Sequence, residues 1–125
     1  MNLLLDTHVL LWWLNDEPSL SKTSRRAIAD GRNLVFVSAV VVWEIRIKEA
    51  LGKLKIPHNF AAVLADQPFE ELNITLEHAH AVKKLPDIHR DPFDRMLVAQ
   101  ARVEGFTLVT CDVHLKKYRI PLLKA

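Results

Sequence analysis

The sequence predicts an α/β protein, a three-layer α/β/α sandwich with a central, mainly parallel sheet. Short apolar runs of strand length alternate with helix-like segments along the chain. Continuous apolar strands of this kind are typical of a parallel sheet that is covered on both faces. A length of 125 residues, with no repeat, low-complexity tract or linker, predicts a single domain spanning residues 1–125.

The chain begins with a predicted strand and helix. Residues 2–6 contain the apolar run Leu3-Leu4-Leu5, which predicts a buried strand that ends at Asp6. Residues 7–14 predict a helix with Thr7 as a possible N-cap. The apolar side chains on one face of this helix are Val9, Leu10, Trp13 and Leu14.

A helix, a strand and a second helix follow. Ser21 is the expected N-cap of a helix over residues 21–30, and the apolar run 34–37 has the length of a strand. Residues 39–51 are rich in β-branched side chains, so intrinsic propensity favours a strand there. The length of the segment and the helical spacing of its apolar residues instead predict a helix.

The middle of the chain predicts shorter elements. Residues 60–65 predict a short helix, and residues 69–74 predict a strand that two glutamates interrupt. Thr75 is expected to begin another helix, which Pro86 ends.

The last third opens with a strong helix signal. Asp91 and Pro92 fit the N-cap and first position of a helix, and Gly105 fits its end. Residues 107–110 predict a further strand. Residues 118–123 predict a last strand at the edge of the sheet, because the proline within it lacks a hydrogen-bond donor.

Four acidic residues stand where this fold could bring them together. Asp6 and Asp112 follow predicted strands, and open α/β sheets bind ligands at the carboxyl ends of their strands. Glu44 and Asp94 lie in predicted helices with apolar neighbours. Because a carboxylate is costly to bury alone, the group predicts a shared hard cation. Oxygen-only ligands favour Mg²⁺ or Mn²⁺ over zinc.

Each of these acids also has a structural interpretation, which the sequence leaves open. Asp6 and Asp112 could cap the helical turns that follow them, and an acid in the first turn, as at Asp94, is favoured by the helix dipole. Glu44 could form a surface pair with Lys48, four residues later.

The charge distribution favours a polyanionic partner. If the four acids form one cluster, 11 acids remain against 17 lysines and arginines, so the rest of the surface carries +6. An acidic pocket in a basic surround suits RNA or DNA. The single cysteine and the absence of a secretory signal or an apolar span predict a cytoplasmic protein with no membrane association. Motifs for zinc or nucleotide binding do not occur.

Four segments together resemble a known family. They are Leu4-Leu5-Asp6-Thr7-His8, Val42-Trp43-Glu44-Ile45 with the following Lys48 and Gly52-Lys53-Leu54, His89-Arg90-Asp91-Pro92-Phe93-Asp94-Arg95 with Ala99-Gln100-Ala101, and Leu108-Val109-Thr110-Cys111-Asp112. The chain resembles PIN-domain ribonucleases and, among them, the VapC toxins of toxin–antitoxin pairs. The resemblance implies a PIN-like fold in which Asp6, Glu44, Asp94 and Asp112 surround Mg²⁺ or Mn²⁺. One departure is Val41, because a small hydroxyl residue often stands three positions before the glutamate in that family.

The resemblance also implies a function. The expected protein is a metal-dependent endoribonuclease that hydrolyses RNA without a covalent intermediate, as the toxin of a type II toxin–antitoxin system that arrests translation or growth. Asp6 and Asp94 are the expected metal ligands, with Glu44 and Asp112 binding directly or through water. Candidate contacts to the RNA backbone are Arg95, Arg46, Lys48 and Lys53. The alternatives are a structure-specific DNA nuclease and a non-cleaving RNA-binding module.

Two protein partners are expected as well. The apolar cluster Trp12-Trp13-Leu14 exceeds what a small core readily hides, which predicts a homodimer. A cognate antitoxin is expected to place a disordered tail in the acidic pocket, where an arginine could pair with the carboxylates.

Overall fold

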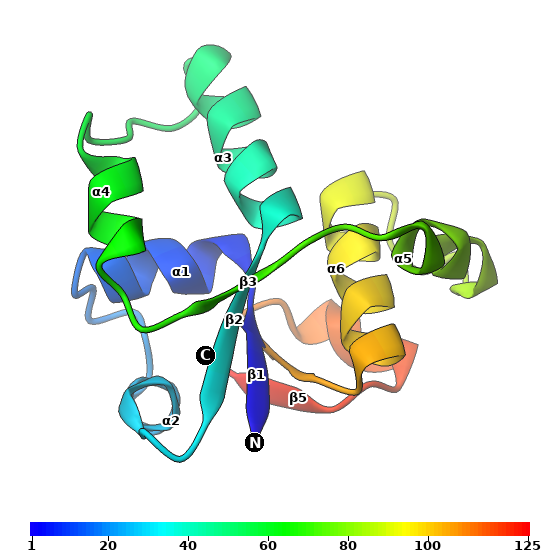
Figure 1. Ribbon diagram of the computed structural model, residues 1–125. Helices are drawn as coiled ribbons and strands as arrows, with labels where there is room; N and C mark the ends of the chain where they lie inside the picture. Colours follow the sequence, from blue (N-terminus) through cyan, green and yellow to red (C-terminus); the bar gives the residue numbers. More distant parts are fainter.

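The computed structural model describes residues 1–125 and contains one five-stranded parallel sheet (Figure 1). The strand order is β3-β2-β1-β4-β5, and every neighbouring pair is parallel. The strands are β1 (Asn2–Leu5), β2 (Leu34–Ser38), β3 (Glu70–Leu72), β4 (Thr107–Thr110) and β5 (Leu122–Lys124). The predicted fold class is confirmed.

Helices cover both faces of the sheet. In Figure 1, α1, α2 and α4 lie to one side of β1 and β2, and α5 and α6 lie to the other. Between these two layers, α3 rises from the end of β2. The helices are α1 (Thr7–Leu14), α2 (Lys22–Ala29), α3 (Ala39–Ala50), α4 (Phe60–Ala65), α5 (Leu76–Ala81) and α6 (Pro92–Glu104), with 3₁₀ segments η1 (Val82–Lys84) and η2 (Val113–Tyr118). None of these helices combines the length and the apolarity that crossing a membrane requires.

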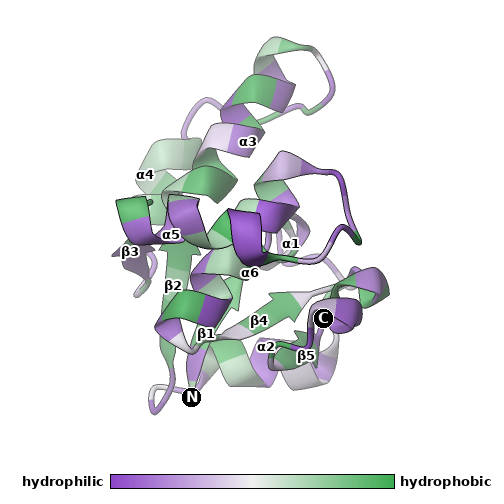
Figure 2. Cartoon of the chain, turned by 90° about the vertical axis from the view of Figure 1, so that its right-hand side faces the viewer, coloured by the Kyte–Doolittle hydropathy of each residue, from purple (hydrophilic) through white to green (hydrophobic).

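The central strands form the core. Leu3, Leu4 and Leu5 of β1 are fully buried, and Leu4 is in register with Phe36 on one side and Leu108 on the other. Figure 2 shows that β2 and β4 are also largely hydrophobic. Near-continuous burial along these strands is the physical consequence of covering a parallel sheet on both faces.

Tertiary packing explains why α3 is a helix in spite of its β-branched residues. Val40, Val41 and Ile45 are buried in the core, so packing outweighs their intrinsic strand preference. The hydroxyl of Ser38 caps the helix by accepting a hydrogen bond from the Val40 N–H at 3.1 Å. The predicted caps at Ser21 and Asp91 are likewise confirmed.

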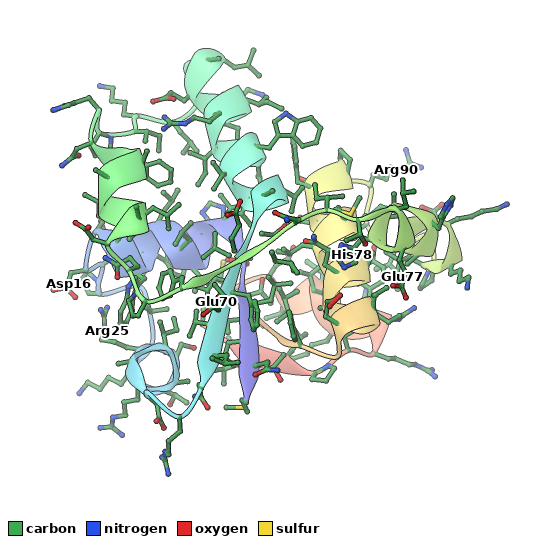
Figure 3. The ribbon with its side chains drawn as sticks, in the orientation of Figure 1. Asp16, Arg25, Glu70, Glu77, His78 and Arg90 are labelled. Atoms are coloured by element: carbon green, nitrogen blue, oxygen red, sulfur yellow. The ribbon has the colours of Figure 1, made fainter.

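A buried polar chain ties the start of α3 to α6. The Ser38 hydroxyl donates to Gln100 Oε1 at 2.6 Å, and Gln100 Nε2 lies 3.3 Å from His78 Nδ1. His78 lies between α5 and α6 (Figure 3), with its Nε2 3.0 Å from Glu104 Oε2. Because all the buried polar side-chain atoms have partners, this chain fixes how α3 and α6 sit against each other.

The structure resolves or corrects several predicted details. Of the two caps that the sequence offered for α1, Asp6 is the N-cap and Thr7 is the first helical residue. The strand predicted over residues 69–74 is confined to Glu70–Leu72. The last strand begins only at Leu122, because η2 runs to Tyr118 and Arg119 then takes a left-handed backbone conformation with φ 57°.

The apolar cluster that motivated a dimer is largely accounted for within the monomer. Trp12, Trp13 and Leu14 are half-buried against the core, and the Trp13 indole N–H donates to Gln67 Oε1 at 2.9 Å. Large exposed apolar side chains lie elsewhere, among them Trp43 at 57% and Leu76 at 80% exposed.

Candidate metal centre

The topology directs ligands to the ends of β1 and β4. The chain builds the sheet from β1 toward β2 and β3, and then returns to add β4 and β5 on the other side of β1. Parallel α/β sheets bind ligands in the crevice at such a reversal, beyond the carboxyl ends of the strands. Asp6 directly follows β1, and Asp112 follows β4 by two residues, so both side chains reach this crevice.

All four acids line one pocket of about 250 Å³ at this position. The lining residues are Asp6, Thr7, His8, Glu44, Lys48, Asp91, Asp94, Cys111 and Asp112. Residues from the ends of β1 and β4 and from α1, α3 and α6 therefore meet, although they are widely separated in the sequence.

Asp6 is both a helix cap and a buried carboxylate. Its Oδ1 accepts a hydrogen bond from the Val9 N–H at 2.8 Å, and the residue is only 7% exposed. Burial raises the pKa of the Asp6 carboxyl above its usual range, although hydrogen bonds from Thr110 and Val9 oppose the shift. The cap interpretation is thus correct, and the cap bond itself occupies only one of the two carboxylate oxygens.

Glu44 is held at both of its oxygens. Its Oε1 accepts a hydrogen bond from the Thr7 hydroxyl at 2.6 Å, and its Oε2 pairs with the Lys48 ammonium. The predicted pair with Lys48 exists, but Glu44 is 6% exposed, so it is no surface pair. Val41, which stands where the family often has a hydroxyl residue, is buried in the core. In this chain the hydroxyl contact to Glu44 comes from Thr7.

Asp94, in the first turn of α6, and Asp112, after β4, complete the pocket. The Asp91 carboxylate caps α6 by accepting from the N–H groups of Phe93 and Asp94 at 2.8 and 3.1 Å. Asp112 caps η2 through the His114 N–H at 3.0 Å. The second oxygen of Asp112 remains directed toward the cluster, where it lies 3.2 Å from a histidine Nε2.

Burial and the neighbouring carboxylates both disfavour the ionised form of Asp94. Burial first, and then the negative charges of Asp91, Glu44 and Asp6, raise the pKa of Asp94 to about 7, while His89 opposes the shift. A cluster of carboxylates with so little compensating charge suits a divalent cation, and its oxygen donors fit Mg²⁺ or Mn²⁺. The residues present therefore fit the ion that the sequence predicts.

The metal-free protein is expected to lose stability on account of Asp94 as pH rises from 3.8, the usual pKa of this carboxyl, to about 7, its pKa in the folded state. Its folded pKa of about 7 lies above the usual 3.8, so the folded state holds a proton that the unfolded state has released. This contribution to stability is full below the unfolded pKa and disappears as pH rises through 7. The Asp94→Asn side chain cannot ionise. At high pH the free energy of unfolding of this variant is expected to exceed that of the wild type by about 2 kcal/mol, after allowance for solvent screening at a partly exposed group.

Urea unfolding in the presence of a chelator measures this difference. The stability curves of the wild type and Asp94→Asn should diverge as pH rises, whereas Asp16→Asn, which changes an exposed carboxylate, should follow the wild type. Parallel curves for wild type and Asp94→Asn would contradict the assigned environment of Asp94.

The predicted RNA contacts divide into two groups. Lys48 lies in the acidic pocket, and Lys53 is exposed just beyond α3. Arg46 instead pairs with Glu49 at 2.9 Å and lies over the ring of Phe60. Arg46 lines a separate cavity between α3 and α4 and not the acidic pocket.

The Arg95 guanidinium is hydrogen-bonded to main-chain carbonyls of the segment before α6. Its guanidinium donates to the main-chain carbonyls of Pro86 and His89, at 2.9 and 3.3 Å, and to that of Val82 at 3.2 Å. These bonds hold the loop before α6. The guanidinium is thus committed to the main chain, which argues against the predicted contact with RNA.

A larger cavity of about 570 Å³ lies between α3 and α4 and is mostly apolar. It contains none of the four clustered acids. We assign the chemistry to the smaller pocket, because the four clustered acids converge there and burial raises the pKa of two of them, Asp6 and Asp94.

Sequence reasoning assigned no role to several residues of the acidic site. Thr7 was expected only as a helix cap, and His89, which contacts both Asp94 and Asp112, was named only within a segment that carries the family resemblance, without a role of its own. The position of His89, two residues before the helix cap Asp91, was the sequence feature that could have placed it near the acids. Burial and the nearby acids raise the pKa of the Cys111 thiol, which keeps it protonated.

The family model described as "PIN domain" matches residues 3–121. The chain belongs to the PIN-domain family. It is 32% identical over 122 residues to Ribonuclease VapC22 of Mycobacterium tuberculosis, covering 94% of this chain and 92% of that relative. The predicted family resemblance is thereby confirmed.

Solved structures share the fold of this PIN domain. VapBC2 from Rickettsia felis, bound to a DNA fragment from its promoter, matches with a TM-score of 0.76 at 18% identity, over 99% of this chain and 98% of that one. DNA-bound VapBC from Salmonella typhimurium matches with a TM-score of 0.71 at 16% identity, over 99% and 98% of the two chains. At these identities the likeness establishes the architecture alone.

Proposed function

We propose that this PIN domain is a metal-dependent endoribonuclease and the toxin of a type II toxin–antitoxin system that arrests translation or growth. One observation carries the proposal: Asp6, Glu44, Asp94 and Asp112 converge on one pocket at the reversal point of the sheet. The relative named Ribonuclease VapC22, which aligns over nearly the whole chain, supports RNA as the substrate.

The four carboxylates have distinct roles in this proposal. Asp6 and Asp94 hold a divalent ion, and Glu44 and Asp112 bind it directly or through water. Mg²⁺ or Mn²⁺ bound there would supply the Lewis acidity for phosphodiester hydrolysis by water. Because Asp6 and Asp112 are fixed as helix caps, and Glu44 is held by Thr7 and Lys48, little reorganisation is needed to accept the ion.

The neighbours of Glu44 maintain this arrangement. The Thr7 hydroxyl and the Lys48 ammonium each hold one oxygen of the carboxylate, so its plane is fixed before an ion binds. Lys48 is also the basic side chain within the pocket, where it can approach a phosphate of the substrate. Lys53 is a second candidate for the RNA backbone.

An antitoxin and a second copy of the chain complete the proposal. The VapBC assemblies with the same fold support a protein partner, and an arginine-bearing tail suits the acidic pocket. Exposed Trp43 and Leu76 give the chain apolar surface for association. Light scattering that shows a strict monomer at all concentrations would remove the dimer from this proposal.

A cleavage assay with RNA and DNA that carry different labels tests the function. Purified protein is expected to cut RNA only with Mg²⁺ or Mn²⁺, to stop in chelator, and to resist competition by DNA of the same sequence. Preferential cutting of DNA would replace the proposal by a DNA nuclease. Binding of RNA without any cutting would replace it by a non-cleaving RNA-binding module.

A further inference from the structure

His89 lies between two carboxylates of the acidic pocket. Its Nε2 is 3.2 Å from Asp112 Oδ2 and 3.3 Å from Asp94 Oδ2. Atoms of the three side chains lie within 4.8 Å of one another, a spacing that also suits three ligands of one metal ion. The imidazole is therefore either a metal ligand or a hydrogen-bond donor to Asp112 that also lies beside Asp94. The two roles differ in whether Nε2 carries a lone pair or a proton.

The other ring nitrogen distinguishes these roles. The main-chain N–H of Asp91 donates to His89 Nδ1 at 3.3 Å. Because a main-chain N–H always presents its hydrogen, Nδ1 must offer its lone pair. The proton of the ring then resides on Nε2, which faces the two carboxylates. An Nε2–H can donate to an acid but cannot bind a metal ion.

The main chain of His89 is held at both its N–H and its carbonyl group. The His89 N–H donates to the hydroxyl of Tyr118 at 2.9 Å, and the His89 carbonyl accepts from Arg95 at 3.3 Å. Tyr118 is itself buried in the core. Exposing a lone pair at Nε2 would require the ring to give up its bond from Asp91, so the surroundings favour the donor role.

We propose that His89 is a positioning residue that donates its Nε2–H to Asp112, with the Asp94 carboxylate alongside at 3.3 Å, and is not a metal ligand. The identity of the ion, but not the placement of the imidazole, rests on the proposed function. The two carboxylates come from different elements and repel each other, so a donor between them offsets the repulsion and sets their spacing. Hydrogen-bonded partners of this kind commonly orient metal-binding groups.

Two substitutions separate the roles. His89→Gln keeps an N–H donor near the position of Nε2, and its amide nitrogen has no lone pair for a metal. His89→Ala removes the donor altogether. His58→Ala, which changes an exposed histidine outside the pocket, is the matched control. Circular dichroism of each variant establishes that the fold is retained.

Calorimetry with Mg²⁺ and with Ni²⁺, an ion that favours imidazole, measures the effect on affinity. If His89 is a positioning residue, His89→Ala should lower the affinity for both ions by the same factor, about tenfold. His89→Gln should recover most of that loss, and His58→Ala should leave both affinities unchanged. A loss confined mainly to Ni²⁺, with no recovery in His89→Gln, would overturn the proposal.

Two spectroscopic readouts are independent of cleavage. Pulsed electron paramagnetic resonance of bound Mn²⁺ should show no directly coordinated imidazole nitrogen in the wild type, and a coupling that vanishes in His89→Ala would overturn the proposal. In the metal-free protein, ¹⁵N resonances of the histidine ring should report a proton on Nε2 and none on Nδ1. This second measurement decides the placement of His89 even if the wild type binds no metal, an outcome that would refute the proposed function instead.

Discussion

Asp6→Asn is expected to lower the rate of RNA cleavage by more than about 100-fold while leaving the fold intact. The variant keeps an oxygen that can accept the Val9 N–H, and Asn is as good a helix cap as Asp, so α1 should form normally. It loses the negative charge that the ion requires. Cleavage of labelled RNA at saturating Mg²⁺ measures the effect.

The same substitution should stabilise the metal-free protein. Burial raises the pKa of the Asp6 carboxyl, which means that its ionised form is disfavoured in the folded state. An uncharged amide avoids this cost. Urea unfolding in chelator near neutral pH should therefore show a higher midpoint for Asp6→Asn than for the wild type.

Asp16→Asn is the matched control for Asp6→Asn. Asp16 lies just beyond the other end of α1, where its exposed side chain pairs with Arg25 at 2.7 Å (Figure 3). Its backbone has φ 51°, a conformation that Asn tolerates well. This variant should cleave RNA at the wild-type rate. Full activity in Asp6→Asn, with its circular dichroism unchanged, would remove Asp6 from the metal site.

Mg²⁺ or Mn²⁺ is expected to stabilise the wild type by about 2.7 kcal/mol at a concentration a hundredfold above Kd. The ion binds the assembled carboxylates of the folded state, which the unfolded chain scatters. For a domain of this size the melting temperature should rise by roughly 10 °C. Thermal unfolding followed by circular dichroism, with and without the ion, measures the shift.

Asp94→Asn provides the specific comparison for this metal effect. The variant should be more stable than the wild type without metal and should gain little when metal is added, because it has lost one ligand and one source of repulsion. Asp16→Asn should gain as much as the wild type. An equal metal shift in Asp94→Asn would show that the ion binds elsewhere on the protein.

Local signals explain how well the sequence predicted the elements. Ser21, Ser38 and Asp91 have side chains that accept main-chain N–H groups, and each caps the helix that was expected after it. The apolar runs of β1 and β4 have the continuous pattern of buried parallel strands. Prediction failed at the start of the last strand, because the helical turn that Asp112 caps runs on to Tyr118 and Arg119 then takes a left-handed conformation, which local propensity does not specify.

The sequence by itself determined that the chain alternates strands and helices and which four acids follow strands or occupy apolar helices. Those properties are local, since they depend on side-chain periodicity and capping chemistry. Only the tertiary structure decided that Thr7 holds Glu44, that Arg95 is used up by main-chain carbonyls, and that His89 stands between Asp94 and Asp112. These contacts join residues from separate elements, and hydrogen bonds of a few ångströms depend on how the helices pack around the sheet.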